Sequence, residues 1–313
     1  MVDMWWIREV WAVFRRSLLM LIVLSFMGGS TFTLFGTVDR VRHYSNPYEF
    51  DFLGWTVAAV MGKSTQAAVG TSHFLAEQDR NDLVRDYMAL VGQLQSKRAE
   101  LEEAFGNPDS LQSSLDVRRV GAELTQLVAE ADKARPIVES ILQEQVAIVL
   151  ADLNLVSRGM IFPPVSFGFA QLPSSLIVSP REMIRQDANI SLRVDLPLEE
   201  KVALEELVEG REDVSALIVP VGGLGTYPTM ILESTSLVWI TEVIAHEWVH
   251  NYLAFHPLGW NYSRTPELRT MNETAASLIG LAVGRLVLAE YYPDLLPQTA
   301  PPTTTENVCI FIY

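Results

Sequence analysis

Residues 243–252 read VIAHEWVHNY and contain His246, Glu247 and His250 in the pattern His-Glu-x-x-His. The flanking positions are uncharged, as expected of a helix that is buried on most sides. Residues four apart share one helix face, so both imidazoles can reach a single metal ion. Glu247 is rotated away from that face and can address a water molecule on the metal. The segment therefore predicts a buried metal-bearing helix, and Zn²⁺ is the expected ion.

The alternative interpretation is a surface helix that carries two His residues by chance. The chain has only five His residues, and three of them lie between positions 246 and 256. A surface helix would also be polar on its outer face, and this segment is apolar on several sides. Both observations favour the metal site.

The same residues resemble the extended signature of zincin metallopeptidases, with Val243 and Tyr252 at its two ends. The resemblance implies that His246 and His250 are zinc ligands. It also implies that Glu247 is the general base and acts through the zinc-bound water.

The region that resembles zincins runs from about residue 190 to 292, roughly a third of the chain. Zincins carry an edge strand shortly before the active helix, and an extended substrate adds to it as a further strand. Gly222-Gly223-Leu224-Gly225 followed by Tyr227–Glu233 is the candidate for that strand.

Two residues compete to be the third zinc ligand. Glu273 lies in Met271–Ala276, which resembles the second zinc helix of gluzincins, both thermolysin-like and aminopeptidase-like. His256 has the spacing of the third metzincin ligand, but metzincins place Gly where this chain has Leu253. A Leu forced to positive φ there costs about 1–2 kcal/mol. We therefore expect Glu273 to be the ligand and keep His256 as the alternative.

The residues that would support the zinc ligands and the substrate match the family pattern less closely than the ligands do. Ser277 stands where thermolysin-like enzymes carry an Asp that supports a zinc-bound His, and Glu242 is a candidate substitute. Loss of such support weakens metal affinity or activity by roughly 10–100-fold. Tyr262 is the nearest positional match for the oxyanion stabiliser, with Tyr291 second, and either ring can instead simply pack in the core.

Residues 17–36 read SLLMLIVLSFMGGSTFTLFG, without a charge, and a helix of this length spans a bilayer core of ~30 Å. Trp5, Trp6 and Trp11 precede it, as interfacial anchors do. A cleaved signal peptide and a buried core helix are the alternatives, but no Ala-x-Ala-like cleavage site follows. We expect one uncleaved, single-pass membrane helix.

Arg residues on either side of this segment give a weak orientation signal. Three precede it and two follow it closely. The positive-inside rule therefore favours a cytoplasmic N-terminus and an extracytoplasmic catalytic domain, although long domains translocate largely regardless of charge.

Composition excludes several classes of protein. The chain has 313 residues, of which 49% are hydrophobic, and a single Cys, so it is neither wholly disordered nor a disulfide scaffold. Its 23 Lys and Arg against 38 Asp and Glu give a net charge of −15, which argues against nucleic acid as a partner.

Four segments are expected. Residues 1–43 hold the cytoplasmic tip and anchor, 44–158 a helical hairpin or stalk, 159–296 the zincin-like domain, and 297–313 a Pro/Thr-rich disordered tail. The hairpin breaks at Gly106–Ser110 and offers a surface for self-association. A third helix is expected to begin at Pro136.

Short β-prone runs and longer helical patterns alternate after Pro163. The expected strands are Ser175–Val178, Ile190–Leu196, Ala216–Val221 and Tyr227–Glu233, and the expected helices are Leu198–Gly210, Leu237–Ala254 and Glu267–Tyr292. The fold class is therefore α+β: a transmembrane helix, a helical hairpin, and a zincin-like domain with a small mixed sheet and two zinc-bearing helices.

The leading functional hypothesis is a membrane-anchored zinc metallopeptidase that hydrolyses peptide or protein substrates. The alternative is a catalytically silent zincin-like domain that serves as a membrane-tethered interaction module. Intact Glu247 favours the enzyme, whereas Ser277 and the short chain after Tyr292 favour the silent form.

Overall fold

The computed structural model describes residues 36–69, 75–105, 111–155, 159–183 and 185–296. The expected membrane helix, except Gly36, and the expected tail at 297–313 lie outside the described residues. So do the residues of the expected break between the hairpin helices, 106–110.

The elements confirm the α+β class. The first part of the chain forms α2 (Thr37–Ser45), the 3₁₀ turn η1 (Asn46–Tyr48), α3 (Phe52–Val69), α4 (Glu77–Phe105) and α5 (Leu111–Asp152). The second part forms β1 (Phe167–Ala170), β2 (Ser174–Pro180), β3 (Ala188–Leu192), α6 (Leu198–Arg211), β4 (Val214–Pro220), β5 (Gly223–Leu224), β6 (Thr229–Leu232), α7 (Leu237–Leu253), α8 (Pro257–Trp260), α9 (Pro266–Tyr291) and the turn η3 (Pro293–Leu295).

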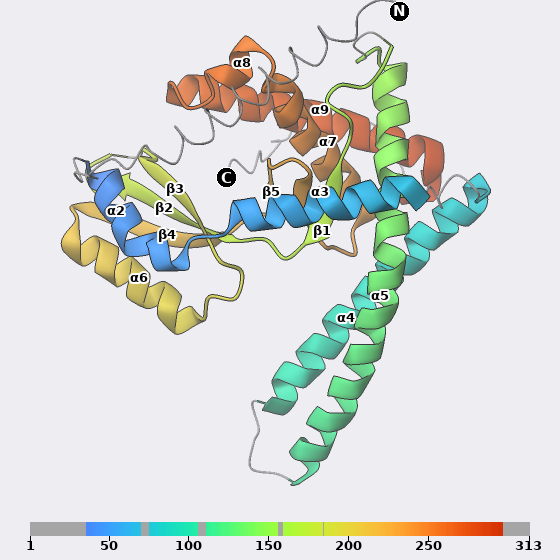
Figure 1. The fold of residues 1–313 in the computed structure, drawn as a ribbon, viewed down its shortest axis with the longest axis horizontal. Helices are drawn as coiled ribbons and strands as arrows, with labels where there is room; N and C mark the ends of the chain where they lie inside the picture. The colour runs from blue at the N-terminus through green and yellow to red at the C-terminus, as the bar shows by residue number, and fades with distance from the viewer. Residues whose placement is uncertain (1–35, 70–74, 106–110, 156–158, 184, 297–313) are drawn as a thin grey trace, which may run out of the picture.

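Helices α4 and α5 lie side by side, and one end of the pair extends away from the rest of the chain (Figure 1). The prediction that a third helix begins at Pro136 was wrong, because α5 continues through this residue as one helix of 42 residues. A proline inside a helix costs about 3 kcal/mol. Val138, Ile141 and Leu142 follow it and are fully buried, and each such side chain contributes about 1.5–3 kcal/mol. Burial therefore outweighs the lost backbone hydrogen bond.

The strands form two three-stranded sheets rather than the single one expected. The first is antiparallel in the order β3-β2-β4, with Leu176 opposite both Ile190 and Ile218. One face of this sheet is buried against α6 and α2, and these elements share a hydrophobic core. We call strands β2, β3 and β4 together with α2 and α6 the sheet lobe.

The second sheet is mixed, in the order β1-β6-β5, with β1 parallel and β5 antiparallel to β6. The central position of β6 leaves the two-residue strand Gly223–Leu224 at one edge. Strand β1 was not expected from the sequence.

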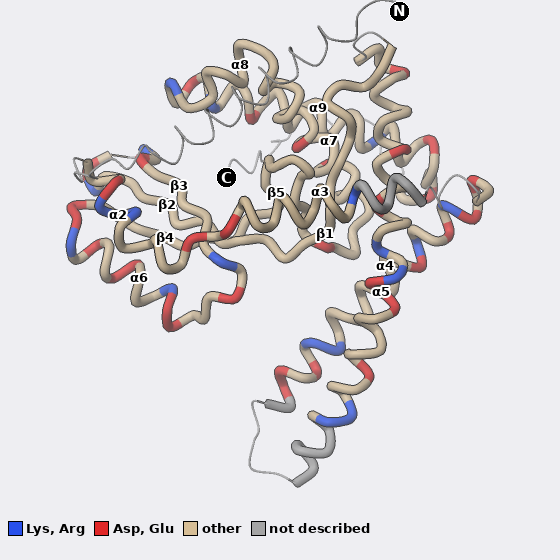
Figure 2. Tube along the Cα trace, viewed as in Figure 1, with Lys and Arg blue, Asp and Glu red and all other residues tan. Residues whose placement is uncertain are grey.

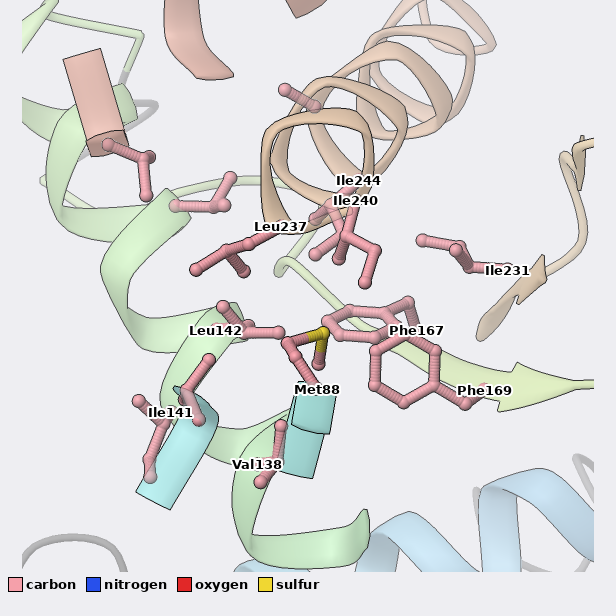
Figure 3. Close-up of a cluster of buried hydrophobic side chains, with 14 of the residues drawn as sticks. Met88, Val138, Ile141, Leu142, Phe167, Phe169, Ile231, Leu237, Ile240 and Ile244 are labelled. Atoms are coloured by element: carbon pink, nitrogen blue, oxygen red, sulfur yellow. The ribbon is translucent and has the colours of Figure 1, made fainter. Parts of the chain in front are cut away.

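Helix α7 is held in a larger core to which α4, α5, β1 and α9 also contribute. Figure 3 shows Leu237, Ile240 and Ile244 of α7 facing Leu142 of α5 and Phe167 of β1. The buried part of the α4/α5 hairpin therefore shares one hydrophobic core with the helix that carries the His-Glu-x-x-His motif.

Among the described helices, α9 is the one whose length and composition would allow it to cross a membrane. One third of its most apolar stretch is buried, and α9 packs along α7. Core helices of folded domains have the same length and composition, so we assign α9 to the domain.

Candidate metal centre

Helix α7 begins at a clear N-cap. The Ser236 hydroxyl accepts a hydrogen bond from the amide of Trp239 at 3.3 Å, which satisfies one of the free donors of the first turn. The helix continues to Leu253, and His246 and His250 lie one turn apart on it. Their side chains are only partly exposed and line a cleft.

Helix α9 approaches α7 closely because of two glycines. A Cβ on residue 280 would lie 2.9 Å from the carbonyl oxygen of Glu242, and one on residue 284 would lie 2.7 Å from Glu242 Cγ. Ala276, also spaced by four, is fully buried at the same side. This spacing of small residues lets α9 lie against the motif helix, so that Glu273 reaches the two imidazoles.

Three candidate ligand atoms lie close together, one from each of His246, His250 and Glu273. His246 Nε2 and His250 Nε2 are 3.0 Å apart, and Glu273 Oε2 lies 3.6 Å and 3.4 Å from them. Tetrahedral ligands at the usual zinc distances of ~2.0–2.2 Å are separated by about 3.3 Å. The cluster therefore has the spacing of a metal site. Two imidazoles and a carboxylate suit zinc but do not exclude other divalent transition metals.

The charges of the cluster are coupled. Burial acts to raise the pKa of Glu273, but hydrogen bonds from His246 and His250 outweigh it and hold this pKa below its ordinary value. The pKa of His250 is raised because its contacts with Glu273 and Glu247 outweigh burial. The Glu273 carboxylate is therefore ionised, and it attracts the imidazoles of His246 and His250.

Asn272 supports His250 from behind. The Nδ1–H group of His250 donates to Asn272 Oδ1 at 2.8 Å, and Nε2 on the other side of the ring faces His246 and Glu273. Asn272 is 2% exposed, and its Nδ2 donates to Leu258 O. No hydrogen bond joins Glu242 to either imidazole in the described part of the chain. The sequence predicted Asn272 only as part of the gluzincin-like pattern and not as the support of His250, although it precedes the candidate ligand Glu273 directly.

Glu247 lies next to the cluster, against β5. The side chain is 8% exposed, and a Cβ on residue 223 would lie 2.5 Å from its Oε1. Gly223 is therefore the residue that leaves room for the carboxylate. Burial raises the pKa of Glu247 above its ordinary value, and the neighbouring His246 and His250 oppose this only in part.

Tyr262 contacts the third candidate ligand directly. Its hydroxyl donates to Glu273 Oε1 at 2.6 Å, and the guanidinium of Arg269 lies over its ring at 5.6 Å. Burial and the neighbouring carboxylate raise the pKa of Tyr262. A role as oxyanion donor would require this hydroxyl to leave Glu273. Tyr291 lies beside Tyr292 at the far end of α9 and does not line the cleft.

His256 is not part of the cluster. It is the N-cap residue of α8, and its ring packs on Tyr252 with the centroids 4.4 Å apart. Leu253 is the last residue of α7 and keeps a helical conformation, so the chain makes no tight turn there. The structure thus brings Glu273, rather than His256, to His246 and His250.

The cluster opens into a cleft of about 940 Å³ between α7, α9 and the two sheets. This volume is in the range of sites for small ligands and peptides. Leu232 N donates to Gly222 O, so in this antiparallel pair the amide and carbonyl of Gly223 point away from β6. β5 is thus an open edge beside Glu247.

The outer edges of the other sheet strands are covered. Glu139 and Gln143 of α5 accept hydrogen bonds from β1, Glu205 and Glu209 of α6 accept them from β4, and residues 48–50 bond to β3. Within the described residues, β5 is the edge strand that borders the cleft.

No protein-family model, curated protein or solved structure matches this chain. The chemistry of the site is therefore argued from its own geometry.

Proposed function

We propose that this chain is a membrane-anchored, zinc-dependent metallopeptidase of the gluzincin type. The observation that carries the proposal is the convergence of His246, His250 and Glu273, whose ligand atoms lie within 4.8 Å of one another. Glu247 stands beside this cluster, and all four side chains line one cleft.

The residues of the site have separate roles in the proposed reaction. A zinc ion bound by the three ligands would supply Lewis-acid activation of a water molecule and of the scissile carbonyl. Glu247 Oε accepts a proton from water and delivers it to the leaving amine. Burial raises the pKa of Glu247 above its ordinary value, so this carboxylate holds a transferred proton more readily than an exposed one would.

The substrate backbone is held by β5. An extended peptide that adds to this edge bonds to the outward amide and carbonyl of Gly223. That position lies directly beside the Glu247 carboxylate. The outer edges of the other described strands are covered by helices or by residues 48–50, so β5 is the edge to which a peptide can add.

Residues 17–36 would anchor the enzyme as a single-pass helix, with the catalytic domain on the extracytoplasmic side. This part of the proposal rests on the uncharged length of the segment alone.

The alternative, a catalytically silent interaction module, has one structural observation in its favour besides the two sequence features given above. The Tyr262 hydroxyl is engaged with Glu273 and not directed at a substrate position. The two functions predict the same metal content and opposite activities.

The test is hydrolysis of a mixture of quenched-fluorescent peptides by the zinc-loaded full chain in detergent. The wild type should cleave peptides, and Glu247→Gln should lose about 10²–10⁴-fold in rate while it retains zinc. Absence of cleavage by a zinc-loaded wild type would favour the silent module. Equal rates for both proteins would contradict the role of Glu247.

A further inference from the structure

Helix α3 turns an apolar face to the outside of the described part of the chain. Leu53 and Val57, one turn apart, are 77% and 52% exposed, and Val60 and Met61 continue the stripe as exposed residues. Residues spaced by three and four positions share one face of a helix. The outer face of a surface helix is usually polar, so a stripe of large apolar side chains indicates contact with a nonpolar partner.

The one charged residue of α3, Lys63, lies on the inner side of the helix. Its ammonium pairs with Glu139 of α5, and the two side chains are 18% and 9% exposed. Glu139 also accepts a hydrogen bond from the amide of Phe169 in β1. Burial of a charged pair costs desolvation, and apolar side chains left in water forgo their burial. The polarity of α3 is therefore the reverse of that expected at a boundary with water.

The start of α3 is close in the chain to the predicted membrane anchor. The uncharged segment ends at Gly36, and α3 begins at Phe52. Residues 37–51 between them contain α2 of the sheet lobe and the turn η1. This stretch spans at most about 35 Å, because a helical residue advances ~1.5–2 Å and an extended one ~3.4 Å. A bilayer that holds the anchor is therefore within reach of the apolar face.

The charges of α3 decide which kind of surface fits. Residues 52–62 contain no Lys or Arg, so the face offers nothing to anionic headgroups. Asp51 precedes the helix, and its carboxylate accepts a hydrogen bond from the amide of Gly54 at 2.9 Å. The net charge of −15 disfavours close approach of a second copy of the chain. A zwitterionic lipid surface is therefore the partner that these features favour.

We propose that α3 lies on the bilayer surface, with the stripe of Leu53, Val57, Val60 and Met61 in the interfacial layer of a phosphatidylcholine membrane. Helices that lie in this layer bury their apolar face at the boundary of headgroups and acyl chains. The contact is a second attachment beside the anchor and restricts the swing of the domain about it. The inference rests on the membrane anchor of the proposed function and is independent of peptidase activity.

The test places the environment-sensitive fluorophore nitrobenzoxadiazole at residue 53 of the full chain. The native Cys309 is replaced by Ser, Leu53→Cys is labelled, and the protein is reconstituted singly in phosphatidylcholine nanodiscs. The probe should show blue-shifted emission and lose about half of its intensity when the lipid carries a nitroxide high on its acyl chain. Ala129→Cys, exposed on α5, is the matched control and should show neither change. In Figure 2, α3 is tan over most of its described length, whereas the outer part of the α4/α5 hairpin carries red and blue segments.

A charge introduced into the stripe tests whether the attachment is apolar. Val57→Glu should reduce nitroxide quenching at residue 53 about twofold or more, because the interfacial layer disfavours the buried charge. Val57 is exposed, so the fold tolerates this change. Ala129→Glu is the control and should leave the quenching at residue 53 as it is. The quenching should also persist at high salt, which screens charges but not apolar contacts.

A probe at residue 53 that aqueous iodide quenches as strongly as the probe at residue 129 would overturn the inference. So would a shielded probe that nitroxide lipid does not quench, because protein and not lipid then covers the face. Elution of the protein apart from the nanodiscs would contradict the anchor and the inference with it. Lipid quenching without peptide cleavage by the zinc-loaded wild type would contradict the peptidase and leave the surface contact standing.

Discussion

His250 Nδ1 lies 2.8 Å from Asn272 Oδ1, so the residue that precedes the third candidate ligand orients one of the first two. This contact fixes the tautomer of His250 and points its Nε2 at Glu273 Oε2. Adjacent residues of α9 therefore supply both a candidate ligand and the support of another candidate ligand.

Asn272→Ala should weaken zinc binding by roughly 10–100-fold, because the imidazole loses its orienting acceptor. Asn272→Asp, which keeps an acceptor, should retain most of the affinity. Competition with a chromophoric zinc chelator measures both. Met271→Ala is the control, because Met271 is exposed next to Asn272 but outside the cleft, and it should bind zinc like the wild type. An Asn272→Ala affinity equal to that control would refute the supporting role.

Gly223→Ala should reduce peptide hydrolysis by an order of magnitude or more without loss of zinc. The new Cβ would lie 2.5 Å from Glu247 Oε1, so the carboxylate must move from its position. Gly225→Ala serves as the control, since its Cβ meets Glu247 Oε2 at 3.4 Å and can be accommodated. Steady-state rates and metal content decide the outcome, and loss of zinc in Gly223→Ala would show a wider structural effect than we expect.

Gly284→Ala should destabilise the fold by about 1–3 kcal/mol, as overpacking does. Its Cβ would lie 2.9 Å from the backbone nitrogen of Glu242, so α9 has to shift away from α7. Gly121→Ala in α5 is the matched control, because nothing lies within 4 Å of the added Cβ. That change should stabilise by about 0.5–1 kcal/mol through helix propensity. Urea unfolding measures both, and the same sign for both variants would contradict the close packing of α7 and α9.

Helices α6, α7 and α9 could be predicted because their signals are local. The Ser236 cap, the Thr265-Pro266 start of α9 and the apolar periodicity each lie within one element. The His246/His250 pair is likewise local, because residues four apart on a helix always share a face.

The remaining features depend on contacts between distant segments. β1 is four residues long and is a strand because it pairs with β6, about sixty residues later. The expected strand Ile190–Leu196 ends at Leu192, where Arg193 N donates to Tyr48 O instead. Helix α5 continues through Pro136 because the residues after it are buried by α4 and α7. No local pattern encodes these partners.

Glu242→Gln should stabilise the metal-free protein at pH 7 and have little effect near pH 4. Burial raises the pKa of Glu242, and the nearby charge of Arg285 opposes this only in part. The folded state thus binds the proton more tightly than the unfolded state, and the free energy of unfolding falls as pH rises through the ordinary pKa toward the raised one. Gln has no carboxyl group to ionise, so the Glu242→Gln variant does not lose stability in this way as the pH rises. Urea unfolding of both proteins with a chelator, across pH 4 to 7, tests the sign; a difference that shrinks toward pH 7 would contradict it.

The zinc content of the purified full chain tests the central claim most directly. After loading and removal of free metal, the wild type and His256→Ala should hold about one zinc per chain, and His246→Ala and Glu273→Ala should hold almost none. Inductively coupled plasma mass spectrometry measures the ratio. Zinc lost from His256→Ala and retained by Glu273→Ala, or a wild type that binds no zinc, would contradict the account.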